Sequence, residues 1–134
     1  MIGLDSNLIV RYLTQDDREQ SAKATAIIER RLSEQDRGFI SVVALAETAW
    51  VLERAYGFSD AAIAAAIERM LQIDVLEIES EQQVFTAMIA LKESRGSFAD
   101  ALIGALGAKA GCSCTLTFDK KALRLGGFAD AAEA

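Results

Sequence analysis

The chain opens with MIGLDSNLIVRYL (Met1–Leu13), in which a short apolar run, a lone aspartate and a second apolar stretch follow one another. Ile2–Leu4 is typical of a buried strand, and the apolar residues of Leu8–Leu13 recur at the spacing of a helix. Asp5 stands at the junction, and α/β domains place ligand-binding side chains just after the carboxyl ends of their strands. The stretch therefore predicts a strand, an acid and a helix in that order, and Asp5 is the first candidate functional residue.

The rest of the chain continues this alternation of strands and helices. Further strands are expected at residues 38–40, 75–78 and 113–117. Helices are expected at residues 18–35, 41–55, 60–72, 81–94 and 97–110, with a helical turn at 120–123. Alternating elements predict an α/β fold with a short central parallel sheet flanked by helices. The tail, residues 129–134, is expected to fray.

Length, composition and charge limit the possible functions. With 134 residues, of which 51% are apolar, the chain forms one domain with a real core. The net charge of −6 argues against binding polyanions by bulk attraction, so a phosphate substrate requires a local basic patch or a bound cation. No signal peptide is visible, and no uncharged run reaches the ~18 residues of a membrane helix. We therefore expect a cytoplasmic protein without a membrane segment.

The two cysteines favour the same compartment. Cys112 and Cys114 are two residues apart on an expected strand, which is a poor geometry for a mutual disulfide. Without histidine they cannot complete a zinc site. We expect both to be small buried apolar residues in a reducing compartment.

Three further acids stand alone in apolar sequence, as Asp5 does. Glu47 is the only charge in GFISVVALAETAWVL, Asp100 is the only charge in GSFADALIGALGA, and Asp119 ends AGCSCTLTFD. A carboxylate removed from water is costly unless it is paired, hydrogen-bonded or bound to a metal. Because the chain has no histidine, the four carboxylates together indicate a shared cation of the kind that prefers oxygen ligands, Mg²⁺ or Mn²⁺.

Each acid also has a simpler structural explanation. Glu47 lies on a helix expected to be apolar all round, so we expect it to be buried, and an ion pair with an arginine is its alternative role. Asp100 stands three residues after Ser97, which is a capping-box pattern. Asp5 and Asp119 could each cap the helical segment that follows. The hypothesis of a metal site therefore rests on the four acids together.

Four segments of the chain resemble one known family. They are MIGLDSNLIVRYL (Met1–Leu13), ISVVALAE (Ile40–Glu47), FADALIG (Phe98–Gly104) and TFDKK (Thr117–Lys121). Their order and spacing resemble PIN-domain ribonucleases, specifically the VapC-type toxins of bacterial toxin–antitoxin pairs. The resemblance runs from Met1 to about Phe128 and implies a single PIN-like nuclease domain over residues 1–128. Ser97 is a departure, since many relatives carry an acid there.

The resemblance implies a Mg²⁺- or Mn²⁺-dependent endoribonuclease that acts as the toxin of such a pair and hydrolyses RNA. The residues that match the family's catalytic and metal-binding acids are Asp5, Glu47, Asp100 and Asp119. Small polar residues that could hold the attacking water are Ser6, Asn7 and Thr117. Members of this family form homodimers and are silenced by a small antitoxin whose basic side chain enters the acidic pocket.

Basic and exposed apolar residues suggest how partners would bind. The candidates for contacting RNA phosphates are Arg11, Arg95, Lys120, Lys121 and Arg124, although such charges could equally form a solvated face. These contacts would position RNA without reading its sequence. Candidate dimer contacts, each of which could equally belong to the core, are Trp50, Phe58, Phe85 and the apolar face of Asp60–Gln72.

Two other functions compete with the nuclease hypothesis. The first is a catalytically silent PIN-like module that binds RNA or a protein, and the presence of all four acids argues against it. The second is a phosphatase of the haloacid-dehalogenase type, which also begins with a strand and an aspartate. It requires a second aspartate two residues after the first, and Asn7 occupies that position.

Overall fold

Parallel strands joined through helices form the framework of the protein. The computed structural model describes every residue, 1–134, and none of its helices is both long and apolar enough to cross a bilayer. The first half of the chain contains β1 (Ile2–Gly3), α1 (Ser6–Thr14), α2 (Arg18–Ala26), the π-helical turn η1 (Ile27–Arg31), β2 (Gly38–Ile40), α3 (Val42–Arg54) and α4 (Asp60–Leu71). The second half contains β3 (Leu76–Ile78), α5 (Glu81–Lys92), α6 (Phe98–Lys109), β4 (Thr115–Thr117), the 3₁₀ turn η2 (Ala122–Arg124), β5 (Phe128–Asp130) and the 3₁₀ turn η3 (Ala131–Glu133).

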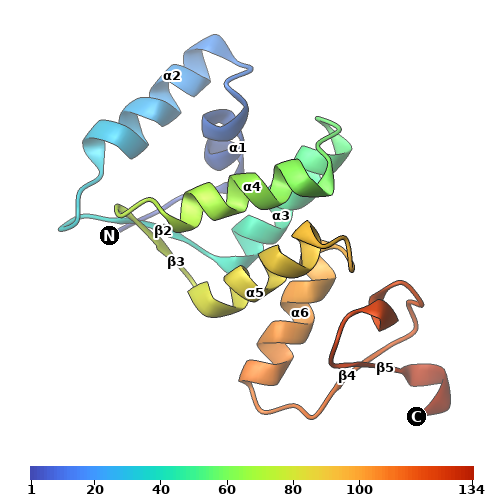
Figure 1. Ribbon diagram of the computed structural model, residues 1–134. Coiled ribbons are helices and arrows are strands. Elements are labelled where there is room, and N and C mark those ends of the chain that lie inside the picture. Colours follow the sequence, from blue (N-terminus) through green and yellow to red (C-terminus); the bar gives the residue numbers. More distant parts are fainter.

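The strands are divided between two sheets. β1, β2 and β3 form one parallel sheet, in which Gly38 of β2 pairs with Ile2 on one side and Leu76 on the other. β4 and β5 form a second parallel sheet, in which Thr115 pairs with Phe128. Figure 1 shows the second sheet beside α6 and apart from the three-stranded sheet. The predicted α/β class with parallel strands and flanking helices is confirmed.

Two glycines of α6 set how closely the second sheet approaches that helix. A Cβ atom at Gly104 would lie 2.6 Å from Cε1 of Phe128 in β5. A Cβ atom at Gly107 would lie 3.0 Å from Oγ1 of Thr115 in β4. A methyl group at Gly104 would overlap the Phe128 ring, and one at Gly107 would press tightly on Thr115, so the absence of side chains permits this packing.

Serine caps begin three of the helices where the sequence predicts them. The hydroxyl oxygens of Ser41, Ser59 and Ser97 each accept a hydrogen bond from the backbone N–H three residues later, at 3.1, 3.2 and 3.1 Å respectively. A cap of this kind stabilises a helix by about 1 kcal/mol, because it satisfies an amide that has no partner within the helix. These local signals explain why the starts of α3, α4 and α6 agree with the prediction.

Two segments differ from the expectation. The helix expected over residues 18–35 ends as α2 at Ala26, continues only as η1, and is followed by a tight turn in which Ser33 and Asp36 form an isolated bridge. The tail expected to fray carries β5 and η3, and β5 is held by its pairing with β4. A three-residue strand after two glycines has too little apolar periodicity to be recognised in the sequence.

One continuous hydrophobic core joins the three-stranded sheet to the helices. It contains 24 buried residues and extends from Leu4, after β1, to Leu125, after η2. Ile40, Leu45, Leu52 and Val84 are completely inaccessible to solvent. Because elements from both ends of the chain contribute to the same core, β2 and the buried faces of α3 and α5 form a firm support for the residues around them.

Candidate functional site

Asp5 and Glu47 lie on either side of one buried hydroxyl group. Asp5 is the N-cap of α1, and its Oδ1 accepts a hydrogen bond of 2.7 Å from the backbone N–H of Ser6. The Ser6 side chain, which is only 5% exposed, donates to Oε1 of Glu47 and lies 3.4 Å from Oδ1 of Asp5. A hydroxyl carries a single proton, so Glu47 receives it in this geometry. Ser6 therefore holds carboxylates from α1 and α3 next to each other.

Glu47 is exposed, which corrects the expectation that it is buried. The buried face of α3 is formed by Leu45, Thr48, Ala49 and Leu52. The opposite face stays open, with Val43 74% and Trp50 58% exposed. Apolar residues thus lie on every side of α3, but only one face of this helix is buried. The alternative of a buried ion pair is also wrong, because no arginine or lysine pairs with Glu47.

Asp100 and Asp119 line a common cleft of about 530 Å³. Asp100 lies in the first turn of α6 and is half-buried. Its backbone N–H donates to Ser97, while its carboxylate forms no ion pair or hydrogen bond within the chain. The predicted cap is therefore provided by Ser97 alone, and both oxygens of Asp100 remain free for a ligand.

Asp119 follows β4 and is partly committed to its own turn. Its Oδ1 accepts a hydrogen bond of 2.9 Å from the backbone N–H of Lys121, which is the capping role considered as the alternative. The hydroxyl of Thr117 accepts a hydrogen bond of 3.0 Å from the backbone N–H of Asp119. Thr117 thus orients the acid, and the second carboxylate oxygen stays available. Asn7 is exposed, and its side chain makes no hydrogen bond within the chain.

The four acids form two groups rather than one. Asp5 and Glu47 meet at Ser6, whereas Asp100 and Asp119 meet at the cleft, and no three acidic or cysteine side chains come close enough to hold one metal ion. Oxygen donors suit Mg²⁺ or Mn²⁺ chemically, but this arrangement does not fit a four-acid metal centre. The two acids that follow strands also lie after strands of different sheets. Asp5 follows β1 and Asp119 follows β4, and these strands are not neighbours.

α3 connects the two groups. Glu47 of this helix contacts Ser6, while Ala46 and Trp50, its neighbours on the same helix, line the cleft with Asp100 and Asp119. α3 also packs directly against α6, the helix that carries Asp100. Each acidic group therefore has one member on this pair of packed helices, Glu47 on α3 and Asp100 on α6.

The cleft also gathers positive charge. Its basic lining residues are Arg54, Arg95, Lys121 and Arg124, and its acidic ones are Glu53, Asp60, Asp100 and Asp119. Three of the five phosphate-binding candidates thus lie there, and Lys120 is exposed outside it. Arg54 was not predicted from the sequence, because it lies at the end of α3, away from the recognisable motifs. In a chain of net charge −6, a cleft with as many basic as acidic side chains repels an anion less than the average surface of the chain does.

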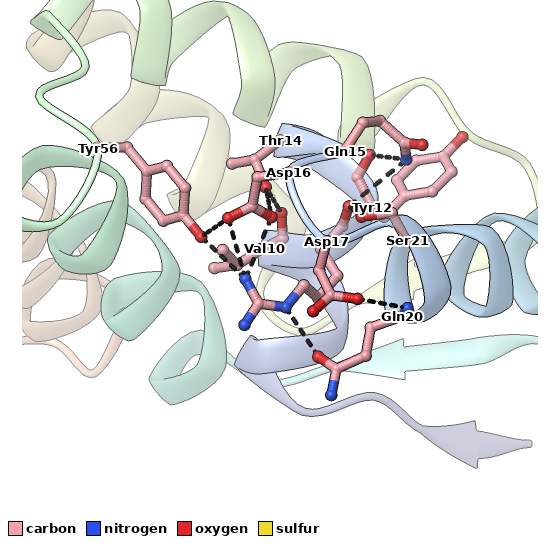
Figure 2. Close-up of polar contacts among 10 residues, drawn as sticks. Val10, Tyr12, Thr14, Gln15, Asp16, Asp17, Gln20, Ser21 and Tyr56 are labelled. Carbon is pink, nitrogen blue, oxygen red and sulfur yellow. Dashed lines mark hydrogen bonds and ion pairs between the residues drawn. The ribbon is translucent and has the colours of Figure 1, made fainter.

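Arg11 has a structural role instead of a place in the cleft. Its guanidinium donates to Asp16, at 3.1 and 3.2 Å, to the Tyr56 hydroxyl at 3.0 Å and to Gln20 at 2.8 Å. Figure 2 labels these three partners. The Tyr56 hydroxyl in turn donates to Asp16 at 2.6 Å. This network joins α1, α2 and the segment after α3. Arg11 is therefore not among the basic residues that the structure brings to the cleft.

The cysteines also differ from the expectation. Cys112 and Cys114 are both exposed rather than buried. Both are free thiols, as the sequence predicts. Both lie in the segment between α6 and β4.

Comparison with known families agrees with this architecture. The chain matches the PIN domain over residues 2–127, which is nearly its whole length. No individual curated protein matches it. PIN domains are commonly metal-dependent nucleases and often occur in toxin–antitoxin systems. With its parallel strands, flanking helices and this match, the chain belongs to the PIN domain family.

Proposed function

We propose that this PIN domain is a metal-dependent endoribonuclease that hydrolyses RNA phosphodiester bonds as the toxin of a toxin–antitoxin pair. The observation that carries the proposal is the Asp5–Ser6–Glu47 arrangement, in which two carboxylates are held at one hydroxyl with no basic side chain to neutralise them. Adjacent like charges favour binding of a cation. Membership of a family that is commonly nucleolytic supports the same conclusion.

The proposed catalytic residues are Asp5, Glu47, Asp100 and Asp119, with a metal ion bound by a pair of these acids and not by all four at once. A bound Mg²⁺ or Mn²⁺ would supply positive charge for phosphate and water. The chain's own residues orient these acids, since Ser6 donates to Glu47 and Thr117 binds the backbone of Asp119. In the cleft, Arg95, Lys121 and Arg124 would contact RNA phosphates.

RNA cleavage tests this proposal. The protein is expected to cut single-stranded RNA with Mg²⁺ or Mn²⁺ and to lose this activity in EDTA. Asp5→Asn is expected to be inactive but folded, because asparagine caps a helix as well as aspartate does. Asp74→Asn is the matched control, since Asp74 is an exposed acid whose carboxylate takes part in neither acidic group. Full activity in EDTA, or in Asp5→Asn, would contradict the proposed function.

The proposed biological role includes a homodimer, a small antitoxin with a basic inhibitory side chain and a location in the cytoplasm. Its support is the toxin–antitoxin association of the family, the free thiols and the exposed apolar side chains of α3. Expression of the chain alone is expected to arrest growth, and co-expression of the small protein encoded beside it is expected to restore growth. Harmless expression of an RNA-cleaving protein would remove the toxin role but not the nuclease activity.

A catalytically silent PIN-like binding module is the second candidate function. The observation that favours it is that no three acids approach closely enough to hold one ion. It predicts RNA or protein binding that is independent of divalent metal and produces no cleavage. The same cleavage experiment therefore decides between the two candidates.

A further inference from the structure

Trp50 is a large aromatic side chain left in solvent beside the proposed site. It is the only tryptophan of the chain and is 58% exposed on α3. It lines the cleft that also contains Asp100 and Asp119. A ring that is this accessible and lines the cleft is free to contact a ligand or a partner.

Arg54 lies over the Trp50 ring. Its guanidinium carbon is 5.7 Å from the ring centroid, which is within the range of a cation–π contact. The two residues are four positions apart on α3, so the helix itself sets this geometry. Arg54 forms no ion pair with a carboxylate. The pair therefore presents an aromatic plane and a planar cation to the same cleft.

The charges around Trp50 favour a ligand with both flat and anionic parts. Lys121 and Arg124 line the cleft without an ion pair, while Arg95 is paired with Glu93 at 2.9 Å. Because four acids line the same cleft, attraction to phosphate alone does not hold a polyanion there. A ligand that also stacks on an aromatic ring gains binding free energy from the stacked contact, in addition to its attraction to the basic side chains.

We propose that Trp50, together with Arg54, forms a stacking site for one unpaired base of the RNA substrate. This inference rests on the proposed function for the identity of the ligand. A base in a duplex is covered by its neighbours, whereas a base in a single strand is free to stack on an aromatic side chain. Trp50 is therefore a positioning residue that selects unpaired RNA and places its backbone near Asp100 and Asp119.

The fluorescence of the sole tryptophan reports directly on this site. The full chain carrying Asp5→Asn, which prevents cleavage, is titrated with single-stranded RNA of mixed sequence, with the same RNA as a duplex and with an abasic strand of equal length. Binding is followed separately by anisotropy of a label on the RNA. Quenching of indole fluorescence is expected with the single strand, and much less with the duplex or abasic strand. Binding of the single strand without quenching would overturn the inference.

Variants distinguish stacking from other roles. Trp50→Leu is expected to weaken binding of single-stranded RNA by about 5- to 150-fold, which corresponds to the loss of one stacked base. Trp50→Phe is expected to retain part of the affinity. Phe85→Leu is the matched control, because Phe85 is 51% exposed and lies outside the cleft. Melting temperature and circular dichroism identify any variant that fails to fold.

The possible results separate this inference from the proposed function. RNA cleavage with unchanged binding by Trp50→Leu overturns the stacking site and leaves the nuclease intact. Quenching by RNA without any cleavage supports the stacking site and contradicts the nuclease. If Trp50→Leu abolishes self-association and leaves RNA affinity unchanged, the ring belongs to an interface between copies and the inference is wrong. Absence of any RNA binding contradicts both.

Discussion

At the scale of single residues, the acids differ in how many hydrogen-bond donors of the chain surround each carboxylate and in whether one of these donors is a basic side chain. Asp16 receives hydrogen bonds from Tyr56, Thr14 and Arg11, so its charge is fully compensated within the chain. Glu47 receives one from Ser6 and has no basic partner. An exposed carboxylate without a cation keeps its capacity to bind one. This contrast is the reason for assigning Asp16 to stability and for proposing Glu47 as a metal-binding residue.

The Asp16 network predicts a specific dependence of stability on pH. The Tyr56 hydroxyl, and then the Thr14 hydroxyl, lower the pKa of Asp16 from its ordinary value of 3.8 to about 2. Because the pKa is lower in the folded state, this acid stabilises the fold above about pH 4, and the contribution is lost as pH falls towards 2. The melting temperature of Asp16→Asn is therefore expected to be lower than that of the wild type at pH 6 and to converge with it near pH 2.

Thermal unfolding of both proteins between pH 2 and pH 6 measures this effect. Tyr56→Phe removes the strongest cause of the low pKa of Asp16, so its stability is expected to fall less between pH 4 and pH 2 than that of the wild type. Parallel pH profiles for the wild type and Asp16→Asn would contradict the assignment.

At the scale of secondary-structure elements, local signals predicted the helices better than the sheet. Ser41, Ser59 and Ser97 each begin a helix where the sequence places it, because capping depends only on residues a few positions away. The three-residue strand β2 was also predicted, since Gly38–Ile40 stands between a polar turn and a capping serine. The division of the strands into two sheets was not predictable, because the choice of neighbouring strand depends on packing between distant parts of the chain.

The packing of β4 and β5 against α6 leads to a prediction for Gly104. Its replacement by alanine would force a methyl group into the ring of Phe128, at a cost of about 1–3 kcal/mol that helix propensity offsets by roughly 1 kcal/mol. The global stability therefore changes little, but the second sheet loosens. The Thr115 amide, which donates to Gly127 at 2.8 Å, is expected to exchange its hydrogen faster in Gly104→Ala.

Hydrogen exchange followed by NMR resolves this amide. Gly126→Ala is the control, since no atom lies within 4 Å of a Cβ at Gly126. Equal protection of Thr115 in the wild type and Gly104→Ala would contradict the position of the second sheet beside α6. It would also weaken the explanation for the separation of Asp119 from Asp5.

At the scale of the whole molecule, the candidate site is only partly visible in the sequence. The identity of the four acids follows from their isolation in apolar sequence, and the structure places each at a strand end or in a helix. Their division into two groups could not be predicted from the sequence, because the sequence does not show that β1 and β4 belong to different sheets. The exposure of one face of α3 could not be predicted from the sequence either. Apolar residues such as Val43 and Trp50 predict burial, whereas a functional surface leaves them in solvent.

Binding of Mn²⁺ to the full chain, followed by electron paramagnetic resonance, tests most directly whether these acids hold a divalent cation. The wild type is expected to bind Mn²⁺, and Asp74→Asn is expected to bind it equally well. Asp5→Asn and Glu47→Gln are each expected to weaken binding by about tenfold or more, since even indirect partners of a metal site contribute that much. No binding by the wild type, or the same affinity in all four proteins, would contradict the account.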